Sequence, residues 1–285
     1  MQKTVTRANM ADKRRKMRVQ GGWAPKRNKA ETSKSGDVAI SEKTDNGQSQ
    51  AVAHSSRGQL IFKPTVKTKK EKPDVKIIDE DGEYNISEGP HGLSTIQLCK
   101  NFIEQKETEW IMEQLVTEIP WEEKEIKIFG KKCLQPRLTA WYGDFPYTYS
   151  RLTLKPFQWS PTLNILRDKI EAKTGLKFNS MLANLYRDHK DSVDWHSDDE
   201  KSLGINPIIA SLSFGDTRSF ELKRKPLEEE ENGEDCLQKI KIPLTDGSLL
   251  IMRGATQHDW VHRVAKEYHD RGPRINLTFR NIHPK

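Results

Sequence analysis

The chain has little cysteine and no long apolar run among its 285 residues. Its three cysteines (Cys99, Cys133 and Cys236) lack Cys-x-x-Cys spacing, which argues against a disulfide framework and against a zinc site built on thiolates. No stretch approaches the roughly 20 apolar residues of a transmembrane helix, and the N-terminus lacks the apolar core of a signal peptide. We therefore expect a protein of a reducing compartment that has no membrane partner.

Positive charge is concentrated at the start of the chain. Residues 1–75 carry 18 Lys and Arg against 7 Asp and Glu, whereas the remainder carries 30 against 34. The first segment is also polar and lacks apolar periodicity, so we expect residues 1–74 to form a disordered basic tail. Such a tail suits phosphate backbones, and its cluster Lys13–Lys16 suits nuclear import. The alternative is a tail that only keeps the protein in solution.

Apolar periodicity after the tail predicts an α+β domain. Helical spacing marks 107–116 and about 161–174, and Gly175 closes the second helix. Strand patterns occupy most of the rest, at 126–131, 136–143, 180–186, 208–214, 218–223, 239–242, 247–252 and 274–280. Helices followed by many short strands, with polar residues near the strand ends, predict a jelly roll (double-stranded β-helix) that encloses a pocket.

Two histidines and one carboxylate form the most informative pattern. His196 and Asp198 stand two residues apart, and His262 follows far downstream, with His258 as a rival for the distal position. A His-x-Asp pair alone is common in a chain with eight histidines, and its simplest interpretation is a polar surface pair. Two histidines and a carboxylate on one face of a metal, however, are typical of non-haem Fe(II) oxygenases, because they leave coordination positions open.

A row of polar residues follows the distal histidine. They alternate with apolar residues, the period of a strand whose polar side chains share one face, at Arg274, Asn276, Thr278 and Arg280. Facing inward, such a row would be costly unless an anion lies against it. The alternative is an exposed edge strand with a solvated polar face.

These motifs together resemble the AlkB family of Fe(II)/2-oxoglutarate dioxygenases. The likeness covers about residues 75–283 and, in segments 136–143, 146–150 and 191–200, points to the branch called homologue 3. It implies Fe(II), 2-oxoglutarate and O2, with ascorbate as reductant. It also implies an N-terminal extension (75–160) that carries helices and a nucleotide-recognition hairpin lid, followed by a jelly-roll core (161–285).

The resemblance assigns roles residue by residue. The three matches to the catalytic iron ligands are His196, Asp198 and His262, whereas the spacing of His258 fits less well. Matches to the 2-oxoglutarate-binding residues are Asn184, Tyr186, Arg274, Asn276 and Arg280. Arg274 would pair with the distal carboxylate of 2-oxoglutarate, since a guanidinium fork suits a carboxylate. Arg280 would lie near the end of 2-oxoglutarate that binds the metal. Leu182 matches a pocket position open to self-oxidation.

The implied activity is oxidative demethylation of N1-methyladenine and N3-methylcytosine in single-stranded DNA and RNA. It releases formaldehyde while 2-oxoglutarate and O2 become succinate and CO2. Both lesions are cationic, so carboxylates and aromatic faces favour them. The matching substrate residues are Trp121, Tyr147, Thr148, Tyr149, Asp199 and Glu200. Tyr147 and Tyr149 also fit an ordinary aromatic core.

Phe129 departs from the homologue 3 pattern. It lies in the first predicted hairpin, where the homologue 2 branch carries a phenylalanine that fills the gap left by a flipped base. Phe129 is therefore a candidate wedge for duplex DNA, or else a buried hairpin residue.

Partners and location follow from the resemblance alone. It implies a monomer of the nucleus and cytoplasm and, through the tail, contact with the helicase of the activating signal cointegrator complex. Three alternatives remain open at this point: a same-fold oxygenase of protein side chains, a nucleic-acid binder with a vestigial metal site, and an interaction protein that docks through its tail.

Overall fold

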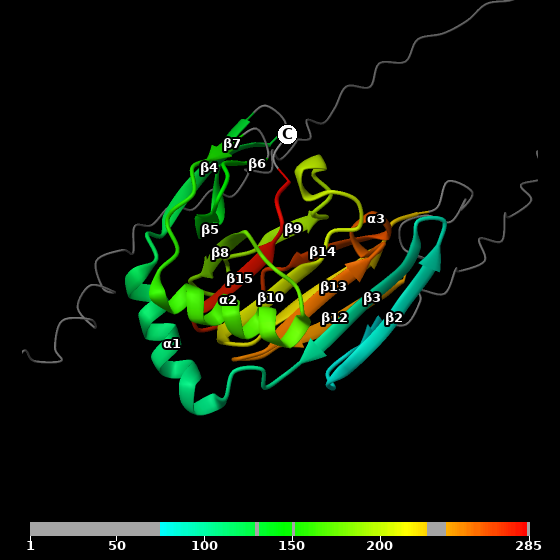
Figure 1. Ribbon diagram of the computed structural model, residues 1–285, viewed down its shortest axis with the longest axis horizontal. Helices are drawn as coiled ribbons and strands as arrows, with labels where there is room; N and C mark the ends of the chain where they lie inside the picture. The colour runs from blue at the N-terminus through cyan, green and yellow to red at the C-terminus, as the bar shows by residue number, and fades with distance from the viewer. Residues whose placement is uncertain (1–74, 129–130, 150–151, 227–237, 284–285) are drawn as a thin grey trace, which may run out of the picture. The chain divides into compact units, whose positions relative to one another are not determined.

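The computed structural model describes residues 75–128, 131–149, 152–226 and 238–283. Within these ranges two β-sheets pack face to face, as a jelly roll requires (Figure 1). The larger has eight strands, in the order β2 (Gly82–Gly89), β3 (Gly92–Cys99), β13 (Leu249–Gly254), β10 (Ile209–Gly215), β15 (Arg274–Arg280), β8 (Ser180–Tyr186), β5 (Lys131–Gly143) and β4 (Glu122–Ile128). The smaller has five, in the order β1 (Val75–Ile77), β12 (Lys239–Leu244), β11 (Arg218–Arg224), β14 (Trp260–Val264) and β9 (Val193–His196).

Helices cover the outer face of the larger sheet. The remaining elements are α1 (Gln105–Glu118), α2 (Pro161–Thr174), the short helices η2 (Lys201–Leu203) and α3 (Thr256–Asp259), and a two-stranded ribbon of β6 (Tyr147–Tyr149) and β7 (Leu152–Leu154). In Figure 1, α2 crosses in front of the larger sheet and α1 lies at its lower left. No helix among the described residues is both long and apolar enough to span a membrane.

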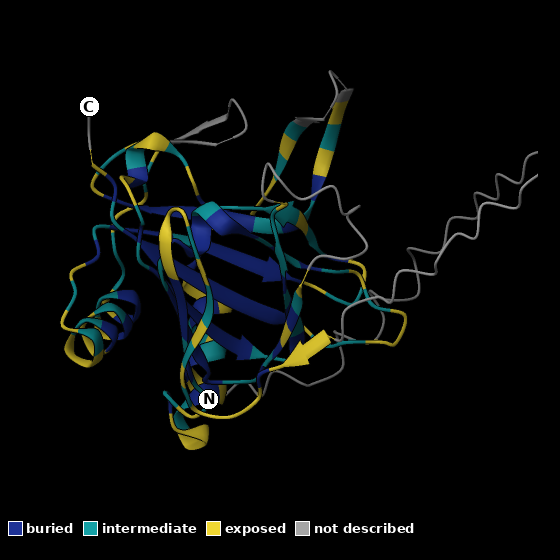
Figure 2. Cartoon of the chain, turned by 90° about the vertical axis from the view of Figure 1, so that its right-hand side faces the viewer, coloured by how far each residue is buried: buried dark blue, intermediate teal, exposed yellow. Residues whose placement is uncertain are grey.

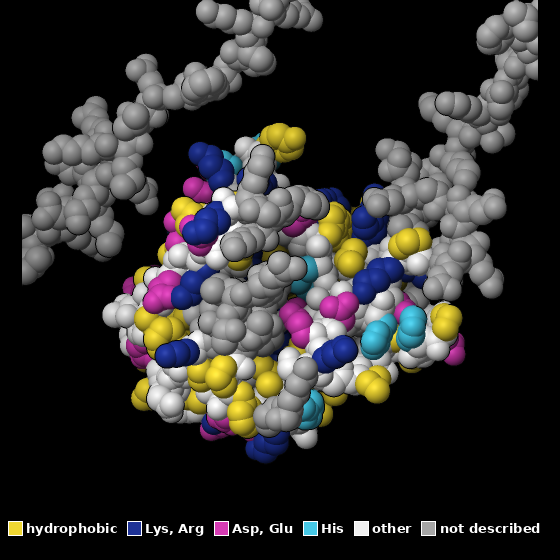
Figure 3. Space-filling model, turned by 90° about the horizontal axis from the view of Figure 1, so that it is seen from above, with side chains coloured by type: hydrophobic (Ala, Val, Ile, Leu, Met, Phe, Trp, Pro, Cys, Tyr) yellow, Lys and Arg dark blue, Asp and Glu magenta, His cyan; other side chains and the backbone are white. Residues whose placement is uncertain are grey.

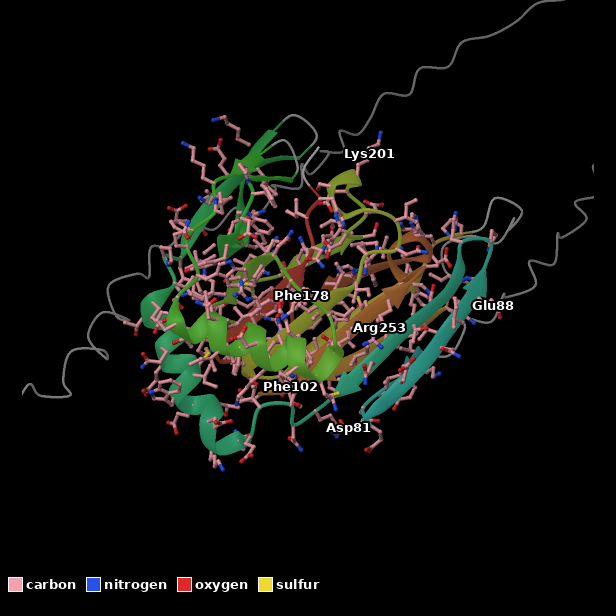
Figure 4. The ribbon with its side chains drawn as sticks, viewed as in Figure 1. Asp81, Glu88, Phe102, Phe178, Lys201 and Arg253 are labelled. Atoms are coloured by element: carbon pink, nitrogen blue, oxygen red, sulfur yellow. The ribbon has the colours of Figure 1, made fainter. Side chains whose placement is uncertain are left out.

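Two apolar layers stabilise the fold, and the central strands of the larger sheet, which separate them, are buried along most of their length (Figure 2). One layer lies between the helices and the larger sheet and includes Leu115, Leu166 and Phe178, the last of which is labelled in Figure 4. The other lies between the two sheets and includes Leu222 and Trp260. The pocket-forming side chains therefore share the inner layer with apolar residues and have little room to move.

Several predicted elements are observed. Helix α2 begins where Ser160 accepts a hydrogen bond from the Leu163 amide at 3.3 Å and ends at Gly175, whose φ of 70° suits glycine. Strand β15 puts its polar row on one face, because all four polar residues line the same cavity between the sheets. The alternative interpretation, an exposed edge strand with a solvated polar face, is therefore wrong, since β15 lies between β10 and β8 and is buried.

Other elements differ from the expectation. Strands β1 to β3 precede the first helix, so the described part of the chain begins with strands and not with helices. The domain boundary at residue 160 stays a prediction; β2 to β5, which precede it, join the same eight-stranded sheet as β8, β10, β13 and β15. The predicted hairpin exists as β4 and β5, but Phe129 at its turn lies outside the described residues.

Candidate metal centre and active site

Three potential metal ligands meet where the smaller sheet ends. His196 is the last residue of edge strand β9, and its Cα is paired in register with that of His262 on β14. The two imidazole centroids lie 4.3 Å apart. One ligand atom from each histidine and one carboxylate oxygen of Asp198 all lie within 4.8 Å of one another. This spacing allows all three to bind one ion, with two histidines and a carboxylate as its ligands.

Neighbouring groups orient each ligand. The Nδ1 of His196 lies 2.8 Å from the carbonyl oxygen of Asp194, so Nε2 is the ring nitrogen left to bind a metal. Arg280 forms an ion pair with Asp198 at 2.8 Å between Nη2 and Oδ2. The ring of Phe220 stacks on His262 with centroids 5.1 Å apart, which shields that imidazole on one side.

The charges of the three residues also suit a metal. Burial lowers the pKa of His262 to about 3, with a further contribution from neighbouring His196, and burial lowers the pKa of His196 as well. Burial alone would raise the pKa of Asp198, but Arg280 and the two histidines outweigh it, and the pKa is lowered. Neutral imidazoles and an ionised carboxylate are the states that bind a cation.

The cavity that adjoins these residues ends at a buried cation. Arg274 is 1% exposed, and burial lowers the pKa of its guanidinium to about 10. Its Nη2 donates to Ser213 Oγ at 2.9 Å, but Nε and Nη1 have no hydrogen-bond partner among the described residues. A buried guanidinium with unused donors is costly unless an anion meets it. A carboxylate in the cavity would satisfy both atoms, so these residues fit 2-oxoglutarate.

The other predicted co-substrate residues line the same cavity. The ring of Tyr186 lies 5.2 Å below the Arg274 guanidinium. Asn276 Nδ2 donates to Ser211 Oγ at 2.8 Å, which fixes the amide. Asn184 Oδ1 accepts from Arg137 Nε at 2.9 Å. Hydrogen bonds within the protein therefore hold both of these amide side chains in place.

Sequence reasoning missed three residues that shape the site. Arg137 is buried at the cavity wall, Phe220 packs on a ligand, and Gln257 accepts the Asp198 amide at 2.9 Å. Arg137 carried a signal, because it is a charged residue within a predicted strand. Phe220 and Gln257 carried none, since their roles depend on strands and loops that only the fold brings together.

The predicted substrate residues do not all line this cavity. Leu182 lines the cavity. Trp121 does not line it: it packs on the helix-covered layer, and its indole donates to Leu115 O at 3.3 Å, so its contact with substrate stays a prediction. Strand β6 includes residues 147–149, but their side chains lie outside the described part.

Two more acidic candidates and the rival histidine lie outside the cavity lining. Asp199 is exposed, with Oδ2 at 2.9 Å from Ser197 Oγ, and Glu200 is partly buried just before η2. Their contact with substrate stays a prediction. His258 lies on α3, where its ring stacks on His91 at 5.2 Å, so the structure does not bring it to the metal ligands.

The chain is similar to known proteins over most of its length. The family model of the 2OG-Fe(II) oxygenase superfamily matches residues 95–280. The chain is 48% identical to human alpha-ketoglutarate-dependent dioxygenase alkB homolog 3 over 96% of this chain and 98% of that protein. It is 38% identical to the DNA oxidative demethylase ALKBH2 of Arabidopsis thaliana, over 67% of each chain. The solved structure of OsALKBH1 aligns with a TM-score of 0.46 and 18% identity, over 65% of this chain and 97% of that chain.

The fold, the ligand set and the family match define an Fe(II)- and 2-oxoglutarate-dependent dioxygenase, with O2 as the second co-substrate. Within that superfamily, the near full-length similarity to the alkB homologs shows that the chain belongs to the AlkB family.

Proposed function

We propose that this dioxygenase removes N-methyl groups from N1-methyladenine and N3-methylcytosine in single-stranded DNA and RNA. The observation that carries the chemistry is the cavity itself, which joins three ligand atoms within 4.8 Å to a buried arginine with open donors. The choice of a nucleobase as substrate is supported by the names of the relatives, which include DNA oxidative demethylases.

In this proposal each cavity residue has one task. His196, Asp198 and His262 hold Fe(II), which with 2-oxoglutarate and O2 supplies the oxidising power that hydroxylates the N-methyl group. Arg274 receives the distal carboxylate of 2-oxoglutarate through its open donors. Arg280, which is already bound to Asp198, lies near the other end. Asn184, Tyr186 and Asn276 complete the polar wall, all three lining the cavity.

The protein also determines where the reaction can occur. Phe220 stacks on His262, and Val264 and Leu182 line the cavity from the smaller and the larger sheet, so apolar side chains lie near the ligands. A base must leave its stack to reach this interior position. The hydroxylated methyl group then departs as formaldehyde, and the base recovers its original structure. Residues 147–149, Asp199 and Glu200 remain our proposed substrate contacts.

The test is demethylation of a single-stranded oligonucleotide that carries one N3-methylcytosine, with Fe(II), 2-oxoglutarate and ascorbate. We expect formaldehyde release and the mass loss of one CH2 with the unaltered protein and with His258→Ala, whose ring lies outside the cavity. His196→Ala should abolish both, because it removes a ligand.

The other arms of this experiment separate the alternatives. A matched duplex tests the wedge role of Phe129, since faster turnover on the duplex would favour it. Succinate without loss of the methyl group on either strand form would reject methylated bases and favour a protein substrate. Absence of succinate with the unaltered protein would favour a nucleic-acid binder.

A further inference from the structure

A second buried arginine lies beside the end of the cavity that Arg274 forms. Arg218, the first residue of β11, is 1% exposed, as is Arg274. The Cζ atom of Arg218 lies 5.6 Å from the centroid of the Tyr186 ring, and that of Arg274 lies 5.2 Å from the same centroid. Arg218 does not line the cavity itself. One aromatic ring therefore connects a cation of the cavity to a second cation outside the cavity lining.

The hydrogen bonds of Arg218 go to the backbone. Its Nη1 donates to Asp188 O at 3.1 Å, and its Nη2 donates to Asp191 O at 2.9 Å and to Ala265 O. These acceptors belong to the segment after β8 and the segment after β14, so the guanidinium joins the two. A planar group held by three acceptors has a fixed position. Arg218 can therefore affect a ligand in the cavity only through its charge and its neighbours.

The positive charge of Arg218 is only partly compensated. Its Nε lies 3.4 Å from Glu267 Oε1, but the Glu267 carboxylate also forms an ion pair with Arg271. The neighbouring carboxylate of Asp191 is paired with Arg187, 2.7 Å from its Nε to Oδ2. Each of these carboxylates thus serves another arginine, which leaves positive potential at this end of the cavity.

The two buried arginines affect each other. The pKa of the Arg274 guanidinium is lowered mainly by burial, and the charge of Arg218 lowers it further. On the face shown in Figure 3, basic and acidic side chains are intermixed, and water and salt screen such exposed charges. Buried charges of like sign are screened much less, so an anion between the sheets would relieve the cost of both.

We propose that Arg218 is a positioning residue that makes the cavity select 2-oxoacids with a second carboxylate. It holds its place beside the Tyr186 ring and adds positive charge behind Arg274 without touching the ligand. The inference rests on the part of the proposed function that assigns the distal carboxylate to Arg274. A 2-oxoacid with one carboxylate leaves both cations uncompensated, whereas 2-oxoglutarate brings them a second negative charge.

The test compares two ligands of the Mn(II)-loaded full chain by calorimetry, 2-oxoglutarate and 2-oxopentanoate. They have the same number of carbon atoms and the same metal-binding end, but only 2-oxoglutarate has the distal carboxylate. The measured quantity is the preference for 2-oxoglutarate, given by the ratio of the two dissociation constants. No substrate is present, so the result does not depend on turnover.

Two variants separate the charge of Arg218 from its hydrogen bonds. Arg218→Gln and Arg218→Lys both lose the planar fork and both can still donate to a carbonyl, but only lysine keeps the charge. We expect Arg218→Gln to lower the preference by about tenfold, the order expected when a unit charge is removed close to a buried anion. Arg218→Lys should keep most of the preference. The control is Lys241→Gln on β12, because Lys241 is 48% exposed and its charge is screened, so its preference should be unaltered.

Glu267→Gln gives a test that leaves Arg218 in place. It removes the carboxylate beside Arg218, so the preference for 2-oxoglutarate should rise, opposite in sign to the effect of Arg218→Gln. This sign, together with the result for Arg218→Lys, decides the inference even where Arg218→Gln does not fold.

The remaining outcomes are distinct. An equal fall in preference in Arg218→Gln and Arg218→Lys would overturn the inference and leave Arg218 with the backbone alone, as would a fall in Glu267→Gln. Equal binding of the two acids by the unaltered protein would reject the role of Arg274 and this inference with it. An unaltered protein that keeps the preference but does not demethylate would reject the proposed substrate alone.

Discussion

Arg274 shows how much can depend on one residue. It lies between the two sheets, where Nη2 donates to Ser213 Oγ at 2.9 Å, while Nε and Nη1 lack partners among the described residues. A folded chain tolerates such a group only if something compensates its desolvation. The burial of Arg274 is therefore better explained by binding of an anionic ligand than by a contribution to the stability of the fold.

Arg274→Lys should raise the KM for 2-oxoglutarate by about tenfold or more. Lysine keeps the charge but loses the planar fork, and one lost hydrogen bond to a charged group is worth roughly 1.5–3 kcal/mol. Metal binding should be unchanged, since Arg274 is not among the three ligands. Succinate production against 2-oxoglutarate concentration measures the effect. Arg271→Lys, an exposed ion-pair partner of Glu267, is the control, and an equal rise in KM there would contradict this role.

Asp191 contributes to stability in a pH-dependent way. Burial would raise the pKa of its carboxyl, but hydrogen bonds from Arg187, one of them 2.7 Å from Nε to Oδ2, outweigh it, and the pKa is lowered. A lowered folded-state pKa means that the contribution is complete above the unfolded value of about 3.9 and is lost as pH falls below it.

Asp191→Asn should therefore lower the free energy of unfolding by about 1–2 kcal/mol at pH 7. The gap between variant and unaltered protein should narrow as the pH falls from about 4, because the carboxyl of the unfolded chain is protonated first, and it should close once the native carboxyl is protonated as well. Urea unfolding at a series of pH values checks this. A gap that stays constant down to pH 3 would show that the ionised form is not what stabilises the fold.

Among the helices and strands, the sequence predicts best those whose own residues specify the secondary structure. Helix α2 carries its own cap residues, and β8 and β15 carry runs long enough to show their period. Strand β9 could not be found, because four residues show no periodicity and its pairing with β14 depends on a partner more than 60 positions away. The ligand set was found because its residue types are specific, whereas the packing of Trp121 on the helix-covered layer could not be predicted, because an aromatic residue fits a core as well as a pocket.

The loop that carries Asp198 is fixed by the segment around α3. Gln257 Oε1 accepts a hydrogen bond from the Asp198 amide at 2.9 Å. Lys225 Nζ donates to the backbone oxygen of Gln257 at 3.1 Å and to Ser197 Oγ at 3.0 Å. The position of one metal ligand thus depends on a neighbouring loop that contributes no ligand itself.

Gln257→Met should weaken metal binding by about 10–100-fold, the usual effect of losing a group that orients a ligand. Gln257→Glu keeps the acceptor and should recover most of the affinity. Titration of Fe(II) or Mn(II) under anaerobic conditions measures this directly. Equal affinity in the unaltered protein and in Gln257→Met would show that Asp198 holds its position without that hydrogen bond.

At the scale of the whole molecule, charge and chemistry are separated along the chain. Residues 1–75 carry the excess of Lys and Arg, whereas the cavity, its ligands and its arginines all lie beyond residue 136. The remainder of the chain has slightly more acidic than basic residues, so its field alone does not attract a polyanion. Electrostatic attraction of nucleic acid by residues 1–75 and the reaction at the metal should therefore be separable by mutation.

Deletion of residues 1–70 should leave metal binding and 2-oxoglutarate turnover intact but weaken binding to unmodified single strands. The log–log salt slope should fall with the number of cations removed from contact, by about 0.7 for each. Oligonucleotide binding measured beside succinate production tests both halves of the prediction. If succinate production fell in parallel with oligonucleotide binding, the two functions would not be separable.

The pairing of His196 with His262 has a further consequence for the life of the protein. Strand β9 is the edge of its sheet, and only two of its residues have Cα partners in β14. An ion held by both histidines would cross-link these strands, much as a disulfide joins two segments, and would be lost wherever iron is scarce. Iron shortage should then appear first as fraying and proteolytic cleavage near residues 193–196, while the rest of the jelly roll stays folded.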